Sequence, residues 1–439
     1  MNNWKENLET ASIRISNSCQ LRCKYCYFFD KCGKLENKTF PIKDIPLIFD
    51  MFPNIKNFEF WGAETLLKID EIIEAILLID NLIKDERVIN YVISSNFAYS
   101  EEQIIKIFNK FVSLDGKLKN HITFYLQASI DFPDYNHNKF RVNEKNEASF
   151  DLCYSAYKSF IKMFEMYQFK NICFGVGTKS TYDVMSITED NAEQIVKDTM
   201  KYMDNDINNV MYLKDKCGID ISLNYLPTFF NFKEANNKTK RGILKFYNVI
   251  FEETFKRVVN SKIPISFMWY YLGRDIERFI NNYIKLIHNP DFNDEDSIFL
   301  SCYFSNIASV DYNGNILPCH RAFTGNNFED YVFGNVYDKT LNEKLISEIN
   351  KKTKYFSNLY KQFKEQILKH PDFDNALAFC YFSLLSSCVC FADSIHENGK
   401  IEEDNIKNYM NVYPIELILF IKEYIDEFKD FFIVNYVEQ

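Results

Sequence analysis

The sequence lacks a surplus of positive charge and has no apolar segment at its start. Its 61 Asp and Glu residues outnumber 51 Lys and Arg residues, which gives a formal net charge of −10 over 439 residues. Nucleic acids and anionic membranes bind concentrated Lys and Arg, so this balance predicts neither as a partner. The start, Met-Asn-Asn-Trp-Lys-Glu, does not resemble a secretory signal. We therefore expect a cytoplasmic protein.

Long apolar runs are also missing. The longest stretch without a charged residue, 375–392, is interrupted by serines and cysteines, so we do not expect it to span a membrane. The acidic balance suits a basic peptide as a partner, although many cytoplasmic enzymes have the same balance. The length allows two or three domains and a large core.

Cysteine, in contrast, is abundant and unevenly distributed. Of twelve cysteines, four lie near the start and five near the other end: Cys19, Cys23, Cys26 and Cys32, then Cys302, Cys319, Cys380, Cys388 and Cys390. Without secretion, clustered cysteines indicate metal or redox sites rather than disulfides. The scattered Cys153, Cys173 and Cys217 are expected to be small buried side chains.

The first cluster has the spacing Cys-x3-Cys-x2-Cys, formed by Cys19, Cys23 and Cys26. A [4Fe–4S] cube has four corners. Three thiolates from one loop leave one iron without a protein ligand, and a small molecule can chelate it. A zinc ion is the alternative, but structural zinc sites need four ligands, commonly in Cys-x2-Cys pairs. The spacing therefore favours an iron–sulfur cluster with one open iron.

This loop resembles the signature of the radical S-adenosylmethionine (SAM) superfamily, including the aromatic Tyr25 before the last cysteine. The resemblance implies that the amino and carboxylate groups of SAM bind the open iron. An electron passed to the sulfonium then releases a 5′-deoxyadenosyl radical, so the cofactor carries the difficult chemistry. A reducing partner such as flavodoxin or ferredoxin is also implied.

The first 260 residues alternate short β-branched or aromatic runs with longer helical patterns, which is typical of an α/β protein with a parallel sheet. Strands are expected at residues 11–16, 57–61, 90–94, 122–130, 171–177 and 219–226. Helices are expected at residues 69–84, 101–112, 147–167, 191–203 and 240–260. Six such units fit an open partial (βα)6 barrel, with its site at the carboxyl ends of the strands.

Two motifs follow the second and third predicted strands. The segment Gly62-Ala63-Glu64 resembles the Gly-Gly-Glu-Pro segment of the superfamily, although Ala63 replaces its second glycine. The resemblance implies that this backbone edge and the Glu64 carboxylate hold the amino group of SAM. Asn96 lies in a segment that resembles the Thr-Asn-Gly turn of the superfamily, with Phe97 in place of the glycine. Asn96 is therefore a candidate cofactor contact.

Two further motifs lie at the fourth and fifth strands. Ser129, Asp131 and Arg141 resemble the Ser-x-Asp-Gly…Arg pattern of the branch that modifies peptides and proteins. The resemblance implies ribose contacts for Ser129 and Asp131, and a SAM carboxylate contact for Arg141. A strand-end turn with a surface arginine is the alternative. Val176, between two glycines, marks a place where the adenine can approach the backbone, or simply a bulge.

A different module begins after residue 300. Cys302 and Cys319 frame the pattern Cys-x11-Gly-x4-Cys, and its Asn313-Gly314 pair predicts a β-hairpin. With the following His320, the pattern resembles the SPASM or Twitch extension of radical SAM peptide maturases, which binds auxiliary iron–sulfur clusters. Only three cysteines remain for the rest of that pattern: Cys380, Cys388 and Cys390.

Five late cysteines cannot fully ligate two clusters. We expect one auxiliary [4Fe–4S] cluster bound by Cys302, Cys319 and two of the last three cysteines. A second, partly ligated cluster is an alternative if Cys32 or a non-cysteine ligand joins. A buried cysteine-rich helix is the alternative for the last three. The expected domains are a barrel (1–262), a helical bridge (263–300), an α+β auxiliary-cluster domain (301–395) and a helical tail (396–439).

These motifs together predict a radical SAM enzyme that abstracts hydrogen from a peptide or protein. Our first expectation is a thioether or carbon–carbon cross-link in a ribosomally made peptide. Anaerobic sulfatase maturation is the closest alternative, but those enzymes have an aspartate where this chain has His320. His320 is a candidate catalytic base. The alternatives of another class are a non-catalytic iron–sulfur electron carrier and a zinc-stabilised scaffold.

Overall fold

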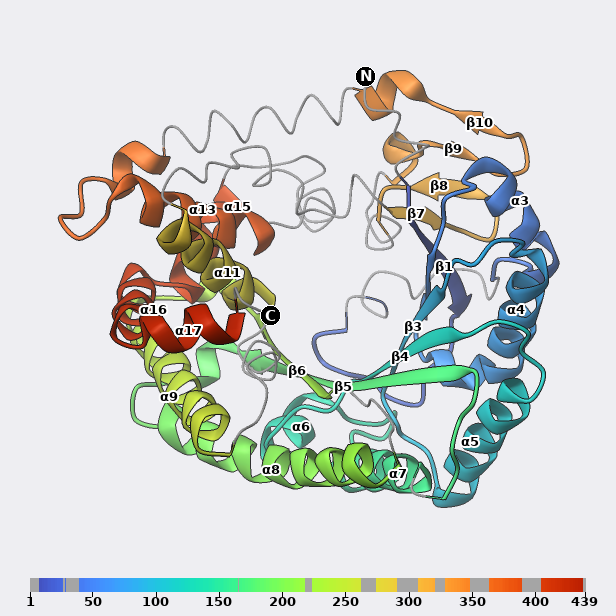
Figure 1. Ribbon diagram of the computed structural model, residues 1–439, viewed down its shortest axis with the longest axis horizontal. Helices are drawn as coiled ribbons and strands as arrows, with labels where there is room; N and C mark the ends of the chain where they lie inside the picture. The colour runs from blue at the N-terminus through green and yellow to red at the C-terminus, as the bar shows by residue number, and fades with distance from the viewer. Residues whose placement is uncertain are drawn as a thin grey trace.

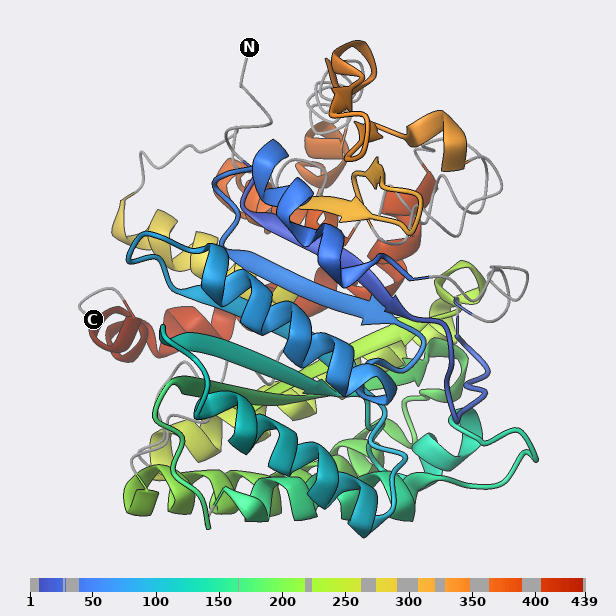
Figure 2. The ribbon, with the colours of Figure 1, turned by 90° about the vertical axis from the view of Figure 1, so that its right-hand side faces the viewer.

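The computed structural model describes residues 8–26, 28, 39–164, 166–217, 223–261, 274–289, 307–319, 328–347, 363–388 and 404–436. Within these ranges, one twisted sheet is strongly curved, and helices cover its outer face (Figures 1 and 2). No described helix is long and apolar enough to cross a membrane.

In the part of the chain that the structure describes, the sheet has ten strands in the order β10-β9-β8-β7-β1-β2-β3-β4-β5-β6. The first six are β1 (Thr10–Ser16), β2 (Asn57–Gly62), β3 (Ile89–Ser95), β4 (Ile122–Ala128), β5 (Ile172–Asp183) and β6 (Leu223–Phe230). They pair in parallel and in chain order. This is the arrangement that consecutive right-handed strand–helix–strand units produce. The predicted α/β fold is confirmed.

Helices connect these strands and complete the rest of the described chain. Those around the parallel strands are α3 (Ile45–Met51), α4 (Ile69–Leu82), α5 (Glu101–Asp115), α6 (Asp134–Phe140), α7 (Phe150–Met163), α8 (Ala192–Cys217) and α9 (Asn237–Ser261). The later ones are α11 (Arg274–His288), α13 (Asn375–Cys388), α15 (Asp404–Val412), α16 (Ile415–Glu427) and α17 (Lys429–Tyr436).

Alternation along each strand separates the two faces of the sheet. In β4 the buried residues alternate with half-buried ones, starting from Ile122. Phe58, Tyr91 and Phe124 stack across neighbouring strands on the buried side, where the helices pack. The other side carries Tyr125 and Gln127, which are only half-buried. A period of two therefore places apolar rings under the helices and leaves polar groups toward the interior.

Several boundaries differ from the prediction. β5 continues past Gly177 to Asp183, because its residues keep pairing with β6 beyond the point where they stop pairing with β4. Val176 therefore lies inside the strand rather than at its end. Helix α8 extends to Cys217, fourteen residues past the predicted end at Met203 (217 − 203 = 14). The short helices α3 and α6 were not predicted.

The late module joins the same sheet. Strand β7 (Ile307–Val310) pairs in parallel with β1, and β8 (Asn315–Leu317) pairs with β7 in the opposite direction. The Oδ1 atom of Asp311 accepts hydrogen bonds from the amides of Asn313 and Asn315, at 2.8 and 2.9 Å. The predicted hairpin is thus confirmed. The sheet ends in β9 (Gly334–Asn335) and β10 (Thr340–Leu341).

The tail is helical, as predicted. Helix α16 buries four side chains, those of Leu417, Ile418, Ile421 and Ile425. Tyr424 of α16 makes edge contacts with Phe251 and Phe255 of α9, with ring centroids 5.0 and 4.9 Å apart. The tail therefore packs against α9, on the side of the molecule opposite to β1 (Figure 1).

Candidate iron–sulfur and SAM site

The cysteine loop begins where β1 ends and is held by backbone hydrogen bonds to the segment after β2 and to the end of α6. The amide of Glu64 donates to the carbonyl of Ser18 at 2.9 Å. From the other side, the amides of Arg22 and Lys24 donate to the carbonyls of Val142 and Phe140, at 2.6 and 2.8 Å. These contacts fix the path of the segment that carries Cys19, Cys23 and Cys26.

Gly62 allows the end of β2 to lie close to the end of β1, just before the cysteine loop. Its φ is +148°, and a Cβ atom here would lie 2.1 Å from the carbonyl oxygen of Ser16. The next amide, that of Ala63, donates to this same oxygen at 3.1 Å. Only glycine permits the end of β2 to approach β1 so closely.

We therefore expect Gly62→Ala to destabilise the protein by on the order of 3 kcal/mol and to lower its iron content. Gly116→Ala is the matched control, because Gly116 has an ordinary φ of −70° and its added Cβ would meet nothing nearer than 3.9 Å. The control is expected to be neutral or stabilising by about 0.5 kcal/mol. Chemical unfolding and iron analysis measure both effects, and equal behaviour of the two variants would contradict this account.

Glu64 is a buried carboxylate that binds the ends of β2 and β3 together. Its Oε1 accepts hydrogen bonds from the hydroxyls of Ser95 and Tyr99, at 2.8 and 3.0 Å, and from the amide of Leu66 at 3.1 Å. Its Oε2 accepts from the amide of Asn96 at 2.8 Å. Burial raises the pKa of Glu64, while these hydrogen bonds oppose the shift. Four donors compensate the burial of this side chain.

Asn96 connects this network to the cysteine loop. Its Nδ2 lies 3.2 Å from the sulfur of Cys19, and its Oδ1 accepts from the amide of Ala98 at 2.7 Å. The following Phe97 has a φ of +56°, the conformation for which the related motif uses glycine. Its buried ring makes edge contacts with Tyr157 and Phe160, which compensates a backbone conformation unfavourable for a large side chain.

Asp131 and Arg141 form a second buried network on the other side of the loop. The Oδ2 atom of Asp131 accepts from Arg141 Nε at 2.9 Å and from the Tyr25 hydroxyl at 2.6 Å. Its Oδ1 accepts from the amide of Thr181 at 2.8 Å. Arg141 Nη1 lies 3.7 Å from the sulfur of Cys23. The arginine is thus buried in an ion pair, so the alternative of a surface arginine is wrong.

His137 of α6 supports this pair as a neutral imidazole. Its Nδ1 accepts from the amide of Asp131 at 3.2 Å, and its Nε2 lies 3.0 Å from the Ser149 hydroxyl. That hydroxyl donates to the carbonyl of Arg141 at 2.7 Å, so Nε2 carries the ring proton. Burial, with a smaller contribution from the Arg141 charge, lowers the pKa of His137 to about 2.

This depressed pKa predicts acid sensitivity. Below the ordinary His pKa of about 6.5, the unfolded chain binds a proton that the folded chain excludes, so stability is lost as the pH falls from 6.5 toward 2. Between pH 7 and pH 5 the loss from this group is about 2 kcal/mol. Urea unfolding at the two pH values should show a smaller decrease, by that amount, in His137→Asn. Parallel decreases in both proteins would contradict the assignment.

Two thiols of the loop have higher pKa values than exposed cysteines have. Burial, then the charge of Glu64, raises the pKa of Cys19 to about 12. Burial also raises the pKa of Cys23 to about 11, against the effect of Arg141. Cluster ligands bind as thiolates, so binding must displace these protons. Donors from Asn96 and Arg141 face the two sulfurs, which suits thiolates bound to iron.

The geometry does not gather the thiols around a single ion. Within the described residues, no three His, Cys, Asp or Glu side chains form a group that could hold one metal ion. A cube binds each thiolate to a different iron, so its ligands need not converge on one point.

The structure also shows the positions of three other predicted cofactor contacts, Ser129, Val176 and Ala63. Ser129 is half-buried just after β4, and its amide donates to the carbonyl of Ser95 at 2.7 Å. Val176 is fully buried in the core that the helices cover, so only its backbone is available to a ligand in the interior. Ala63 packs against a small apolar cluster of Phe28, Trp61 and Leu317.

That apolar cluster links the cysteine loop to the hairpin of the late module. Cys26 packs against it, and Leu317 belongs to β8, two residues before Cys319. Cys319 itself is buried. Arg14 of β1 lies above the rings of Phe28 and Trp61, with centroid distances of 5.2 and 5.9 Å. The segments that precede Cys319 and follow Cys23 therefore meet at one apolar contact.

Of the remaining late cysteines, the structure describes Cys380 and Cys388, both in α13. Cys380 is fully buried within α13, a helix that packs against α11. Helix α13 stands across the ring from β7 and β8 (Figure 1). Cys388 is the last residue of α13. Three other predicted residues of this module lie outside the described residues: Cys302, His320 and Cys390. The same is true of Cys32.

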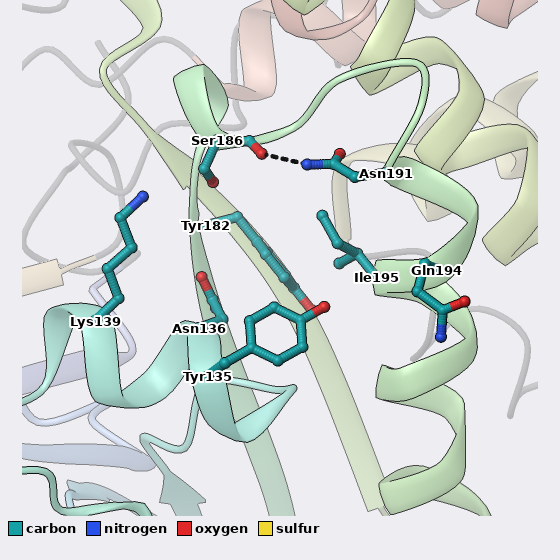
Figure 3. A pocket seen from close by; sticks show the side chains of 8 residues that line it. All are labelled: Tyr135, Asn136, Lys139, Tyr182, Ser186, Asn191, Gln194 and Ile195. Carbon is teal, nitrogen blue, oxygen red and sulfur yellow. Dashed lines mark hydrogen bonds between the residues drawn. The ribbon is translucent and has the colours of Figure 1, made fainter.

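A cavity of about 300 Å³ lies elsewhere, between α6, α8 and the end of β5 (Figure 3). Eight residues line it: Tyr135, Asn136, Lys139, Tyr182, Ser186, Asn191, Gln194 and Ile195. None of the predicted site residues lines it. One of its lining residues, Asn136, donates a hydrogen bond to the carbonyl of Thr181 at 3.0 Å.

Sequence reasoning missed four residues of these networks. Ser95 and Tyr99 bind Glu64, and Thr181 and His137 bind Asp131. Ser95 directly precedes Asn96 in the predicted motif, and this position was a usable signal. Thr181 was out of reach because β5 was expected to end at Gly177.

The chain is similar to known proteins in two respects, a family match in its late module and a likeness to a maturase over most of its length. Residues 302–390 match the family model of the SPASM iron–sulfur cluster-binding domain. The cysteine-type anaerobic sulfatase-maturating enzyme of Clostridium novyi (strain NT) is 22% identical over 355 residues, which cover 76% of this chain and 78% of that protein. The late module therefore matches a SPASM domain, and most of the chain is similar to an anaerobic sulfatase-maturating enzyme.

Solved structures share its fold. The native anSMEcpe structure with bound AdoMet has a TM-score of 0.54 and 15% identity, and the match covers 94% of this chain and 98% of that one. The anSMEcpe structure with bound AdoMet and the Cp18Cys peptide has a TM-score of 0.51 and 14% identity, with the same coverage. These structures confirm the fold, and the family match confirms the predicted SPASM-type iron–sulfur module.

Proposed function

We propose that this radical SAM enzyme oxidises a residue of a peptide or protein substrate. One observation carries the proposal. Two side chains that follow the neighbouring strands β3 and β4 reach the cysteine loop. Asn96, directly after β3, lies 3.2 Å from Cys19, and Arg141, at the end of α6, lies 3.7 Å from Cys23. An electron carrier needs only the cluster ligands. A site at the strand ends, beside an iron that has no protein ligand, can in addition bind a small molecule.

The residues present fit the cofactors. We propose that Cys19, Cys23 and Cys26 hold a [4Fe–4S] cluster whose fourth iron is open to SAM. When bound, this cofactor pair supplies an abstractor of hydrogen atoms. Because Asp131 and Arg141 already bind each other, we propose that they fix the loop. The contacts left for SAM are then the backbone of Gly62 and Ala63, the Ser129 hydroxyl and the backbone at Val176.

For the auxiliary cluster we propose Cys302, Cys319, Cys388 and Cys390 as ligands. The burial of Cys380 among α13 and α11 supports a packing role for that residue. Cys319→Ala is therefore expected to reduce the reconstituted iron from about eight to about four per chain. Cys380→Ala is expected to retain about eight. Iron and acid-labile sulfide analysis distinguishes the two, and a loss in Cys380→Ala alone would reverse the assignment.

Two products are candidates. Our first is a thioether or carbon–carbon cross-link in a ribosomally made peptide, which the histidine at position 320 favours because related maturases have an aspartate there. The second is the oxidation of a protein Cys or Ser, which the similarity to a cysteine-type anaerobic sulfatase-maturating enzyme supports. We further propose a flavodoxin or ferredoxin as electron donor, and a cytoplasmic location.

Candidate peptides with a cysteine, incubated with anaerobic enzyme, reductant and SAM, separate these products. A cross-link is expected to remove two hydrogens, to form no aldehyde, and to join two residues in the fragment spectrum. Sulfatase-type oxidation would instead give an aldehyde that reacts with a hydrazide reagent. A wild-type protein that forms neither product nor 5′-deoxyadenosine under strong reduction would contradict the enzymatic proposal.

A further inference from the structure

Two of the three loop sulfurs face side-chain N–H donors, and the third faces apolar groups. Asn96 Nδ2 lies 3.2 Å from the sulfur of Cys19, and Arg141 Nη1 lies 3.7 Å from that of Cys23. Cys26 packs instead against the cluster of Phe28, Trp61 and Leu317. The loop is therefore polar on one side and apolar on the other.

The orientation of Asn96 is determined by its neighbours. The Ala98 amide can only donate a hydrogen bond, and it lies 2.7 Å from one end of the Asn96 side chain. That end must be the oxygen, so the amino group faces the sulfur. The backbone is held as well, because the Asn96 amide donates to the buried Glu64 at 2.8 Å.

We infer that Asn96 is a positioning residue that raises the reduction potential of the loop cluster through an N–H···S hydrogen bond to Cys19. Arg141 acts in the same direction at Cys23. The reduced cluster carries one more negative charge than the oxidised one, so a donor on a ligand sulfur stabilises the reduced form more. This inference rests on the proposed cluster ligands and goes beyond the assignment of Asn96 as a SAM contact.

The redox step concerned is a one-electron reduction. The cluster passes from its 2+ to its 1+ state, and the electron comes from a low-potential reductant, which is dithionite in the test. Asn96→Asp is the sharpest variant. It keeps the size of the side chain and an oxygen for the Ala98 amide, but it turns a carboxylate oxygen toward the sulfur.

EPR-monitored redox titration without SAM measures the effect. In Asn96→Asp the ratio of reduced to oxidised loop cluster at a fixed potential is expected to fall at least about tenfold, equivalent to 59 mV for one electron. Asn96→Ser, which shortens the side chain and withdraws the donor, is expected to shift in the same direction. Ser94→Ala is the matched control, because Ser94 lies in β3 two residues before Asn96 and its hydroxyl donates to Gln127 at 3.0 Å instead of to a sulfur.

The reduction potential of the auxiliary cluster should not shift, so it serves as an internal reference. Its EPR signal is identified in a protein in which the three loop cysteines are replaced by alanine. Unchanged potentials in iron-replete Asn96→Asp or Asn96→Ser would overturn the inference. Loss of the loop cluster from both variants would also overturn it, since Asn96 would then be needed to hold the loop. A wild-type protein without a loop cluster would instead refute the proposed function.

Discussion

Cys26→Ala is expected to abolish the formation of 5′-deoxyadenosine and to lower the reconstituted iron from about eight to about four per chain. The loop supplies only three thiolates, so the loss of one leaves two corners of the cube without protein ligands. Anaerobic reconstitution followed by iron, sulfide and nucleoside analysis measures both quantities in the same sample.

Cys153→Ala is the control for this experiment. Cys153 is fully buried in α7 and lies outside the loop, so its removal creates only a small cavity. The control is expected to keep its iron and its nucleoside product. Bound zinc without sulfide in the wild type would support the scaffold alternative instead, as would full iron retention in Cys26→Ala.

Arg141→Met is expected to destabilise the protein by about 3–5 kcal/mol, because it leaves a buried carboxylate without its partner. The side chains of Arg141 and Asp131 are 8% and 0% exposed. Their pair also holds the Tyr25 hydroxyl at 2.6 Å. The variant should therefore lose the cluster together with stability. Chemical unfolding and iron content check the two effects.

Two further variants test whether the charge pair is responsible. Tyr25→Phe removes one hydrogen bond to Asp131 and is expected to cost only about 1 kcal/mol. The double variant Asp131→Asn with Arg141→Met removes both charges and should be more stable than Arg141→Met alone. If the double variant were the less stable, the unpaired carboxylate would not be the cause.

The repeated pattern of strands and helices was predictable because it depends on local periodicity. The alternation in β4 and the Asn313-Gly314 turn are signals within a few residues, and both structures form as predicted. The cysteine loop and Glu64 were also found from short motifs. The structure then places them together, because β1 and β2 are neighbours in a parallel sheet.

Long-range partners could not be predicted in the same way. The spacing of Asp131 and Arg141 suggested two ligand contacts, whereas the structure shows that they bind each other and Tyr25. Phe97 at a position of positive φ contradicts local preference, because its ring is held by Tyr157 and Phe160 from a distant helix. Such contacts depend on tertiary packing that no local pattern encodes.

The central claim is that the loop cluster has one iron that SAM can chelate. EPR of the dithionite-reduced protein, recorded before and after addition of SAM, tests it most directly. We expect SAM to change the spectrum of the loop cluster, to leave that of the auxiliary cluster unchanged, and to have no effect in Cys26→Ala. A wild-type spectrum that is identical with and without SAM would contradict the claim.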